Sequence, residues 1–283
     1  MILYDFGPHI AAYTSERDDV VSQDVLLPKL THSCNVEVVN ERKMFPDTDA
    51  LITQVPGLWI GVYSADCVPI LVADTRLKVV AAIHAGWRGT VGGITRATVE
   101  RMTTDFGCRP EDLQAVIGPS ISPEAFEVGE EVVMLFRQAA FPESIIRHQS
   151  SVAGETAAGK TAACVTACES AASITACESE TSDIAACETA ACETEASEAA
   201  ACETAASVTA CESEASDIAD IRSSSFYIDL WQANRWLLTE AGLREEHIQL
   251  TGLCTWGLPN RFFSARREGY STGRIVSAIC INR

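Results

Sequence analysis

Short apolar runs separated by turn residues dominate the first half of the chain. The runs at 59–63, 68–73 and 78–83 are rich in valine, isoleucine and alanine and contain few polar residues. Such runs predict strands that are buried on both faces of a sheet. Another strand is predicted at 113–117, where the run ends in a Gly-Pro-Ser turn.

Helical spacing follows in two places. Between 94 and 106 apolar side chains recur three to four positions apart, and Gly107 supplies a stop. A second helix is predicted after Asp229, a suitable N-cap, with Gly242 at its end. Two further strands are predicted at 248–254 and 275–280. These patterns predict an α/β (α+β) fold in which helices flank mixed β-sheets.

The pattern breaks between residues 151 and 221. This tract is built from alanine, cysteine, glutamate, serine and threonine, and its segment 174–184 recurs almost unchanged at 208–218. The copies lack the large apolar positions that stacked repeats bury. Its seven cysteines lack paired Cys-x-x-Cys spacing, which argues against a metal store. We therefore expect a low-complexity insertion, either disordered or a fluctuating helix, within a single catalytic domain formed by 1–150 and 222–283.

Charge and composition narrow the class of protein. The formal net charge is −18, of which the tract at 151–221 carries −13, so the remainder has an ordinary −5. Neither value favours a nucleic-acid or anionic-membrane partner. No apolar run reaches 18 residues and the first residues do not resemble a secretory signal. We expect a cytoplasmic enzyme whose five cysteines outside the tract are reduced thiols.

Three residues point to a metal. His32, Cys67 and His84 lie in short segments next to predicted strands or turns. Two imidazoles and one thiol suit zinc, with copper as the alternative ion. Three protein ligands leave a fourth position open for water or substrate, which distinguishes a catalytic site from a structural one.

The segment after His84 adds candidates for anion binding. Gly86 and Gly89 permit close approach to the backbone, and Arg88 could clamp a phosphate or carboxylate. These glycines match neither a Walker A loop nor the dinucleotide fingerprint. Asp66, beside Cys67, could orient a ligand or act as a base, or be a turn residue only.

Taken together, several motifs resemble the laccase-domain family, which is also labelled multicopper polyphenol oxidase and is regarded as a family of zinc-dependent purine nucleoside phosphorylases. The two most specific are Ala-Asp-Cys-Val-Pro-Ile at 65–70 and His-Ala-Gly-Trp-Arg-Gly-Thr at 84–90. The resemblance continues, in the family's order, at 117–122, 126–129, 228–230, 233–234, 254–255, 261–267 and 272–274. It covers nearly all of the chain outside the tract.

The resemblance implies a metal triad of His32, Cys67 and His84. It also implies cleavage of adenosine, inosine, guanosine or methylthioadenosine by phosphate, and hydrolytic deamination of adenosine at the same site. Purine nucleoside and phosphate would then be the partners of a monomer or homodimer. The residues expected to act in catalysis are Cys67, His84, Asp66 and Arg88. Those expected to contact substrate or phosphate are Arg17, Arg88, Gly86, Gly89 and Arg266.

Two departures from the family pattern concern the N-terminal part of the chain. The family usually opens with a Thr-Arg-x-Gly-Gly segment that helps wall the pocket, whereas here 12–18 leads almost directly to His32. Arg17 is the one candidate to replace the family's arginine. Leu30 and Thr31 also stand where the family commonly has a glutamine two residues before the ligand. These changes bear on substrate affinity rather than on the triad.

Three alternatives use the same residues. Cys67 could be the nucleophile and His84 the base of a metal-independent hydrolase or amidase. Copper-dependent phenol oxidation follows from the family's older label, although one His/Cys/His group does not supply several copper centres. A non-catalytic metal-binding protein would explain the short N-terminal segment and the acidic tract.

Overall fold

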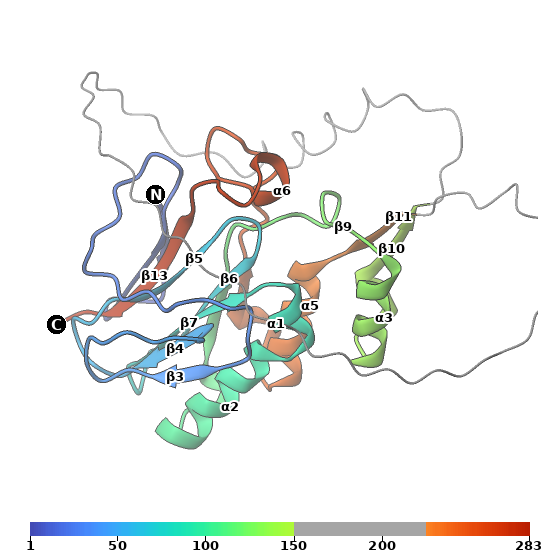
Figure 1. Cartoon of the computed structure of the whole chain (residues 1–283). Coiled ribbons are helices and arrows are strands. Elements are labelled where there is room, and N and C mark those ends of the chain that lie inside the picture. The colour runs from blue at the N-terminus through green and yellow to red at the C-terminus, as the bar shows by residue number, and fades with distance from the viewer. Residues whose placement is uncertain (150–224) are drawn as a thin grey trace, which may run out of the picture. The chain divides into compact units, whose positions relative to one another are not determined.

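The computed structural model describes residues 1–149 and 225–283, and its elements are drawn in Figure 1. The strands are β1 (Ile2–Asp5), β2 (Ile10–Thr14), β3 (Val36–Val38), β4 (Ala50–Thr53), β5 (Ile60–Ser64), β6 (Val68–Asp74), β7 (Val79–Ala85), β8 (Gln114–Ile117), β9 (Glu127–Val128), β10 (Ile146–Gln149), β11 (Ser225–Ile228), β12 (Ile248–Leu250) and β13 (Ile275–Ile281). The helices are α1 (Trp87–Val91), α2 (Ile94–Phe106), α3 (Glu130–Gln138), α5 (Leu230–Glu240) and α6 (Ala265–Glu268), with 3-10 turns at Pro110–Asp112, Glu143–Ile145 and Glu245–His247.

The largest sheet of the described residues has six strands in the order β12-β8-β6-β7-β4-β3. Its central pairs are antiparallel, whereas β12 with β8 and β3 with β4 run parallel, so the sheet is mixed. All seven residues of β6 and of β7 are buried, as expected of two central strands that are covered on both faces.

Two smaller sheets join residues from both sides of the tract. One has the order β1-β2-β13-β5, so the last strand lies between strands from the first 64 residues. The other has the order β10-β11-β9 and brings Ser225–Ile228 between two earlier strands. The described residues after the tract are therefore built into sheets that begin before it.

Alternate residues of the central hairpin face two different cores. Ile70 and Ile83 belong to a core that includes residues of α2 and α5, which lie on one side of the six-stranded sheet (Figure 1). Leu71 and Ala82 belong to a second core with residues of β5 and β13. The six-stranded sheet is thus the middle layer between helices and the four-stranded sheet. This alternation follows from the period of two along a strand.

The predicted fold class is confirmed, and several element boundaries agree closely. The helix predicted at 94–106 is α2, and Gly107 ends it with a φ of +70°. Asp229 caps α5 by accepting a hydrogen bond from the backbone N–H of Gln232 at 2.9 Å.

Other elements differ from the prediction. The strand expected at 248–254 ends at Leu250, because Gly252 follows with a φ of +64° and breaks the extended backbone; Cys254 pairs again only in an isolated bridge with Ser120. Neither β1 nor β2 was predicted: β1 pairs with β2 alone, and β2 pairs on its other side with β13, near the other end of the sequence. The insertion expected at 151–221 lies outside the described residues and stays a prediction.

In the part of the chain that the structure describes, no helix combines the length and apolarity needed to cross a bilayer.

Replacing Leu71 by alanine tests the layered core. Leu71 is 1% exposed between the two sheets, whereas Leu3 on β1 is 77% exposed. We expect Leu71→Ala to lower the free energy of unfolding by about 2–5 kcal/mol, because it leaves a cavity. The matched change Leu3→Ala should alter it by less than about 0.5 kcal/mol. Urea denaturation followed by circular dichroism measures both; equal losses would contradict the layer assignment.

Candidate metal centre

Strand register brings the candidate residues together. In the β6–β7 pair Val68 lies opposite Ala85, so Cys67, just before β6, comes opposite Gly86, just after β7. In the β4–β7 pair Ala50 lies opposite Ile83, so the preceding Asp49 comes opposite His84. The backbone N–H of His84 donates to the carbonyl of Asp49 at 2.7 Å, which extends that ladder by one step.

His32, Cys67 and His84 form a compact group. Their ligand atoms all lie within 4.8 Å of one another, and within the described ranges this is the one cluster of this kind. Cys67 Sγ lies 3.8 Å from His32 Nε2, and the two imidazole rings meet edge to face with centroids 5.0 Å apart. Sulfur and nitrogen ligands of one tetrahedral zinc are about 3.6 Å apart, given the usual bond lengths. The donor set and its spacing therefore fit a zinc ion.

A buried carboxylate organises this group. Asp49 is 0% exposed, and its Oδ1 accepts a hydrogen bond from His84 Nδ1 at 2.7 Å. It also accepts the backbone N–H groups of Thr31, His32 and Ser33 at 3.1, 3.0 and 2.8 Å. Burial raises the pKa of Asp49, but the hydrogen bonds from His84 and Ser33 outweigh it and hold that pKa well below its usual range.

The loop that carries His32 adopts an unusual backbone conformation. His32 has a φ of +61°, in the left-handed region that residues with a Cβ seldom occupy. Three consecutive backbone N–H groups at 31–33 point to one carboxylate, and this convergence holds the loop in place. The side chain of His32 itself is exposed and faces Cys67.

Cys67 and His84 each shift the pKa of the other. Burial raises the pKa of the Cys67 thiol, but the positive charge of His84 and the hydrogen bond with His32 lower it to about 6. Burial lowers the pKa of His84, whereas the Cys67 thiolate and the Asp49 carboxylate raise it to about 9. In the absence of metal the pair is therefore a thiolate beside an imidazolium at neutral pH.

The glycines after His84 are needed for packing. A Cβ on Gly86 would lie 2.7 Å from His32 Cδ2 and 3.1 Å from Cys67 Sγ, so a larger residue would push into the group. A Cβ on Gly89 would lie 3.4 Å from the carbonyl oxygen of Ser33. Gly86 therefore lets the start of α1 approach the loop that holds His32, whereas a Cβ on Gly89 would require only a small shift of its neighbours.

Asp66 connects the Cys67 turn to three distant segments. Its Oδ1 accepts a hydrogen bond from Thr255 Oγ1 at 2.6 Å, and its Oδ2 accepts from Ser264 Oγ at 3.0 Å and from the N–H of Arg266 at 2.7 Å. Its carbonyl accepts the N–H of Ile121 at 3.0 Å. Both carboxylate oxygens are therefore used to hold the 255–266 loop against the turn.

The three predicted anion-binding arginines differ in their surroundings. Arg88 is exposed on α1 and stacks on the ring of Trp87, with 4.3 Å from its Cζ to the ring centroid. Arg17 instead pairs with Glu268 and lies 4.3 Å from the centroid of Phe263. The guanidinium of Arg266 donates to the carbonyl of Glu127 at 2.9 Å. Within the described residues neither Arg88 nor Arg266 has an ion pair, and Arg88 makes no side-chain hydrogen bond either.

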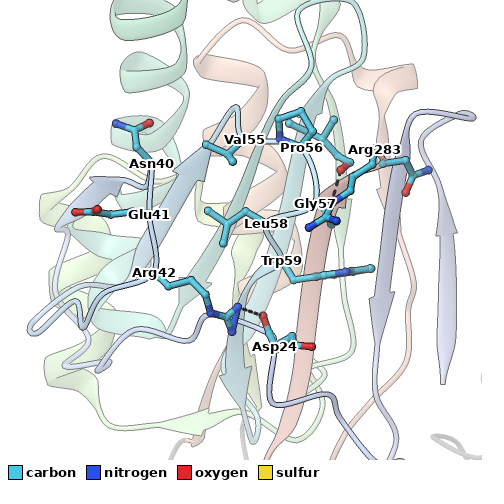
Figure 2. Close-up of a pocket in the computed structure, with 13 residues that line it drawn as sticks. Asp24, Asn40, Glu41, Arg42, Val55, Pro56, Gly57, Leu58, Trp59 and Arg283 are labelled. Atoms are coloured by element: carbon cyan, nitrogen blue, oxygen red, sulfur yellow. Dashed lines mark hydrogen bonds between the residues drawn. The ribbon is translucent and has the colours of Figure 1, made fainter.

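A cavity of about 710 Å³ lies elsewhere on the molecule (Figure 2). Figure 2 shows Arg42 reaching toward Asp24 on one side and Arg283 beside Gly57 on the other. It is lined by Asp24, Asn40, Glu41, Arg42, Val55, Pro56, Gly57, Leu58, Trp59, Cys280, Ile281, Asn282 and Arg283. None of the predicted site residues lines it, so its size does not bear on the His32–Cys67–His84 group.

No pattern in the sequence predicted a role for Asp49. Its local signal is weak, since it is one acidic residue before the short apolar run at 50–52. Its importance appears only when the register of β4 and β7 sets it opposite His84.

Comparison with known proteins gives a consistent picture. Residues 12–159 and 142–282 match the family model of the multi-copper polyphenol oxidoreductase laccase. The chain is 31% identical over 275 residues to a purine nucleoside phosphorylase of Bacteroides thetaiotaomicron, covering 93% of this chain and 75% of that protein. It is 46% identical over 128 residues to adenosine deaminase RL5 of an unknown prokaryotic organism, covering 42% of this chain and about half of that protein (48%).

A solved structure supports the fold. The crystal structure of Neisseria meningitidis protein NMB0706 superposes with a TM-score of 0.63 at 21% identity, covering 100% of this chain and 99% of that one. At this identity the likeness establishes the fold alone.

The thiolate character of Cys67 can be tested in metal-free protein. Because His84 and His32 lower the pKa of Cys67 from 9.0 to about 6, its alkylation by iodoacetamide should reach half its maximal rate near pH 6. In His84→Ala the midpoint should move toward pH 9. Peptide mapping by mass spectrometry separates Cys67 from Cys34, whose pKa burial raises. A wild-type Cys67 that reacts only near pH 9 would show that the charge pair is wrong.

Proposed function

Because the chain belongs to the multi-copper polyphenol oxidoreductase laccase family, we propose that it is a zinc-dependent purine nucleoside phosphorylase. It would cleave adenosine, inosine, guanosine or methylthioadenosine with phosphate to give the free base and ribose 1-phosphate. The observation that carries the proposal is the convergence of His32, Cys67 and His84 within 4.8 Å. Relatives named purine nucleoside phosphorylase and adenosine deaminase support purine nucleoside chemistry.

The proposed roles follow from what each side chain contacts. His32, Cys67 and His84 would hold the zinc, which when bound supplies a Lewis acid that stabilises developing negative charge. In phosphorolysis a phosphate oxygen bonds to C1′ of the ribose while the bond from C1′ to the purine nitrogen breaks. The base leaves with that electron pair and takes up a proton. A cation is required to hold phosphate beside C1′, and we assign Arg88 to this role.

The other predicted residues act indirectly in this proposal. Asp66 has both carboxylate oxygens engaged with the 255–266 loop, so we assign it to positioning that loop rather than to proton transfer. Arg17 is paired with Glu268, so it secures the same loop from the N-terminal side. Arg266 contacts the carbonyl of Glu127 and would need to exchange this partner before binding phosphate.

We also propose that 1–150 and 222–283 form one catalytic domain with the tract at 151–221 inserted into it. In support, β11 pairs with β9 and β10, and β13 pairs with β2 and β5. Asp66, before the tract, is bonded to Thr255 and Ser264, after it.

A second candidate is a metal-independent cysteine hydrolase. In this candidate the Cys67 thiolate would be the nucleophile and His84 its acid–base partner. The Asp49 carboxylate would orient the ring of His84. Against it stands His32, whose Nε2 faces Cys67 Sγ at 3.8 Å, an additional donor that a hydrolase of this type does not need. The family's older label fits less well, because the described residues hold one cluster of this kind rather than several copper centres.

Product analysis tests the proposal. Zinc-loaded protein incubated with adenosine should give adenine and ribose 1-phosphate only when phosphate is present, which chromatography of the products measures. Cys67→Ala should lower kcat/KM by about 100-fold or more, because even partners of metal ligands contribute 10- to 100-fold. Cys34→Ala, the same change at an exposed thiol, should retain near wild-type activity.

Three outcomes would reject parts of the proposal. Equal turnover by Cys67→Ala and wild type would reject the assigned site. Full activity after the metal is removed would favour the cysteine hydrolase. Inosine formed with and without phosphate, and no adenine, would assign the protein to adenosine deamination instead.

A further inference from the structure

We propose that Asp49 is the positioning residue of the centre, the one side chain that fixes two of its three ligands at once. It contacts neither substrate nor the open ligand position in this proposal. It acts by setting the ring of His84 and the backbone around His32. The inference rests on the proposed function in so far as the group it positions is a metal site.

The first half of the role concerns His84. Asp49 Oδ1 accepts the proton of His84 Nδ1 at 2.7 Å, and both side chains are almost fully buried, at 0% and 4% exposure. A carboxylate can only accept here, so Nδ1 carries a proton in every charge state of the ring, and Nε2 is the nitrogen that would give up its proton to bind a metal. Histidines that bind metals commonly have this arrangement, which fixes the ring and raises its basicity.

The second half concerns His32. No strand or helix holds this residue, and its φ of +61° is unfavourable without support. Asp49 Oδ1 accepts a hydrogen bond from the N–H of His32 at 3.0 Å. Its Oδ2 accepts hydrogen bonds from the N–H and from the hydroxyl of Ser33, both at 2.8 Å. An asparagine at position 49 would keep one oxygen acceptor but replace the other oxygen by an NH₂ group. This NH₂ group would face N–H donors and could not accept their hydrogen bonds, so the loop would lose the bonds made to that oxygen.

Sequence neighbours provide a matched control. Asp47 lies two residues earlier, is exposed, and bonds the side chains of Asn35 and Thr31 in the same loop. It makes no hydrogen bond to either imidazole. Asp47→Asn therefore makes the same chemical change, next to the same loop, without touching the contacts that define the proposed role.

Metal affinity is the direct test. Metal-free wild type, Asp49→Asn and Asp47→Asn are titrated with Zn²⁺ in competition with a chromophoric chelator, and their thermal unfolding is recorded. We expect Asp49→Asn to bind Zn²⁺ about 10- to 100-fold more weakly, and Asp47→Asn to match wild type. Equal affinities of wild type and Asp49→Asn would overturn the inference. An equal loss of Zn²⁺ affinity in Asp49→Asn and Asp47→Asn would also overturn it, because the loss would then come from a general disturbance of the loop and not from the hydrogen bonds of Asp49.

A second measurement does not require the variant to fold. Imidazole ¹⁵N NMR of the wild type, with and without Zn²⁺, reports which ring nitrogen of His84 carries a proton. The metal-free spectrum is recorded at alkaline pH, where His84 is a neutral imidazole with a single ring proton. That proton on Nδ1 in both states supports the role of Asp49, and an unprotonated Nδ1 in either state contradicts it. If wild type binds no Zn²⁺, the zinc-dependent function fails, whereas the metal-free spectrum still decides whether Asp49 fixes His84.

Discussion

The antiparallel register of β7 with its two neighbours is the constraint on which the candidate centre depends. It sets His84 opposite Asp49 on one side and brings Cys67 opposite Gly86 on the other. These strands are buried on both faces, so a slip of one residue would move every side chain from one core to the other, and neither core would be filled as it is now. The core that stabilises the fold therefore also fixes the spacing of the chemistry at its edge.

Two aspartates extend this order into segments without regular structure. Asp49 holds the His32 loop through consecutive backbone N–H groups, and Asp66 holds the 255–266 loop through Thr255 and Ser264. Asp49 immediately precedes β4, and Asp66 lies in the turn between β5 and β6, where its carbonyl accepts the N–H of Ile121 at 3.0 Å. A rigid sheet thus provides the anchor points, and loops from distant parts of the sequence are bonded to them.

Whether a feature could be predicted from the sequence depends on how far apart along the chain its interacting residues lie. The buried runs of β6 and β7 and the glycine after α2 carry local signals, and so do Cys67 and His84 at the ends of apolar runs. Asp49 has no such signal, because its role is created by pairing with a strand about 30 residues later. The pairing of Arg17 with Glu268 is likewise invisible in sequence, and it is the reason why we propose a structural role for Arg17.

Zinc and the three residues that would hold it are the centre of the proposed function. X-ray absorption at the zinc edge of the loaded protein tests this claim most directly, because it counts ligands by element and distance. The account predicts one sulfur at about 2.3 Å and two imidazole nitrogens at about 2.0–2.1 Å, with one lighter ligand completing the shell. A shell without sulfur, or a protein that retains no zinc after dialysis, would contradict the assignment of His32, Cys67 and His84.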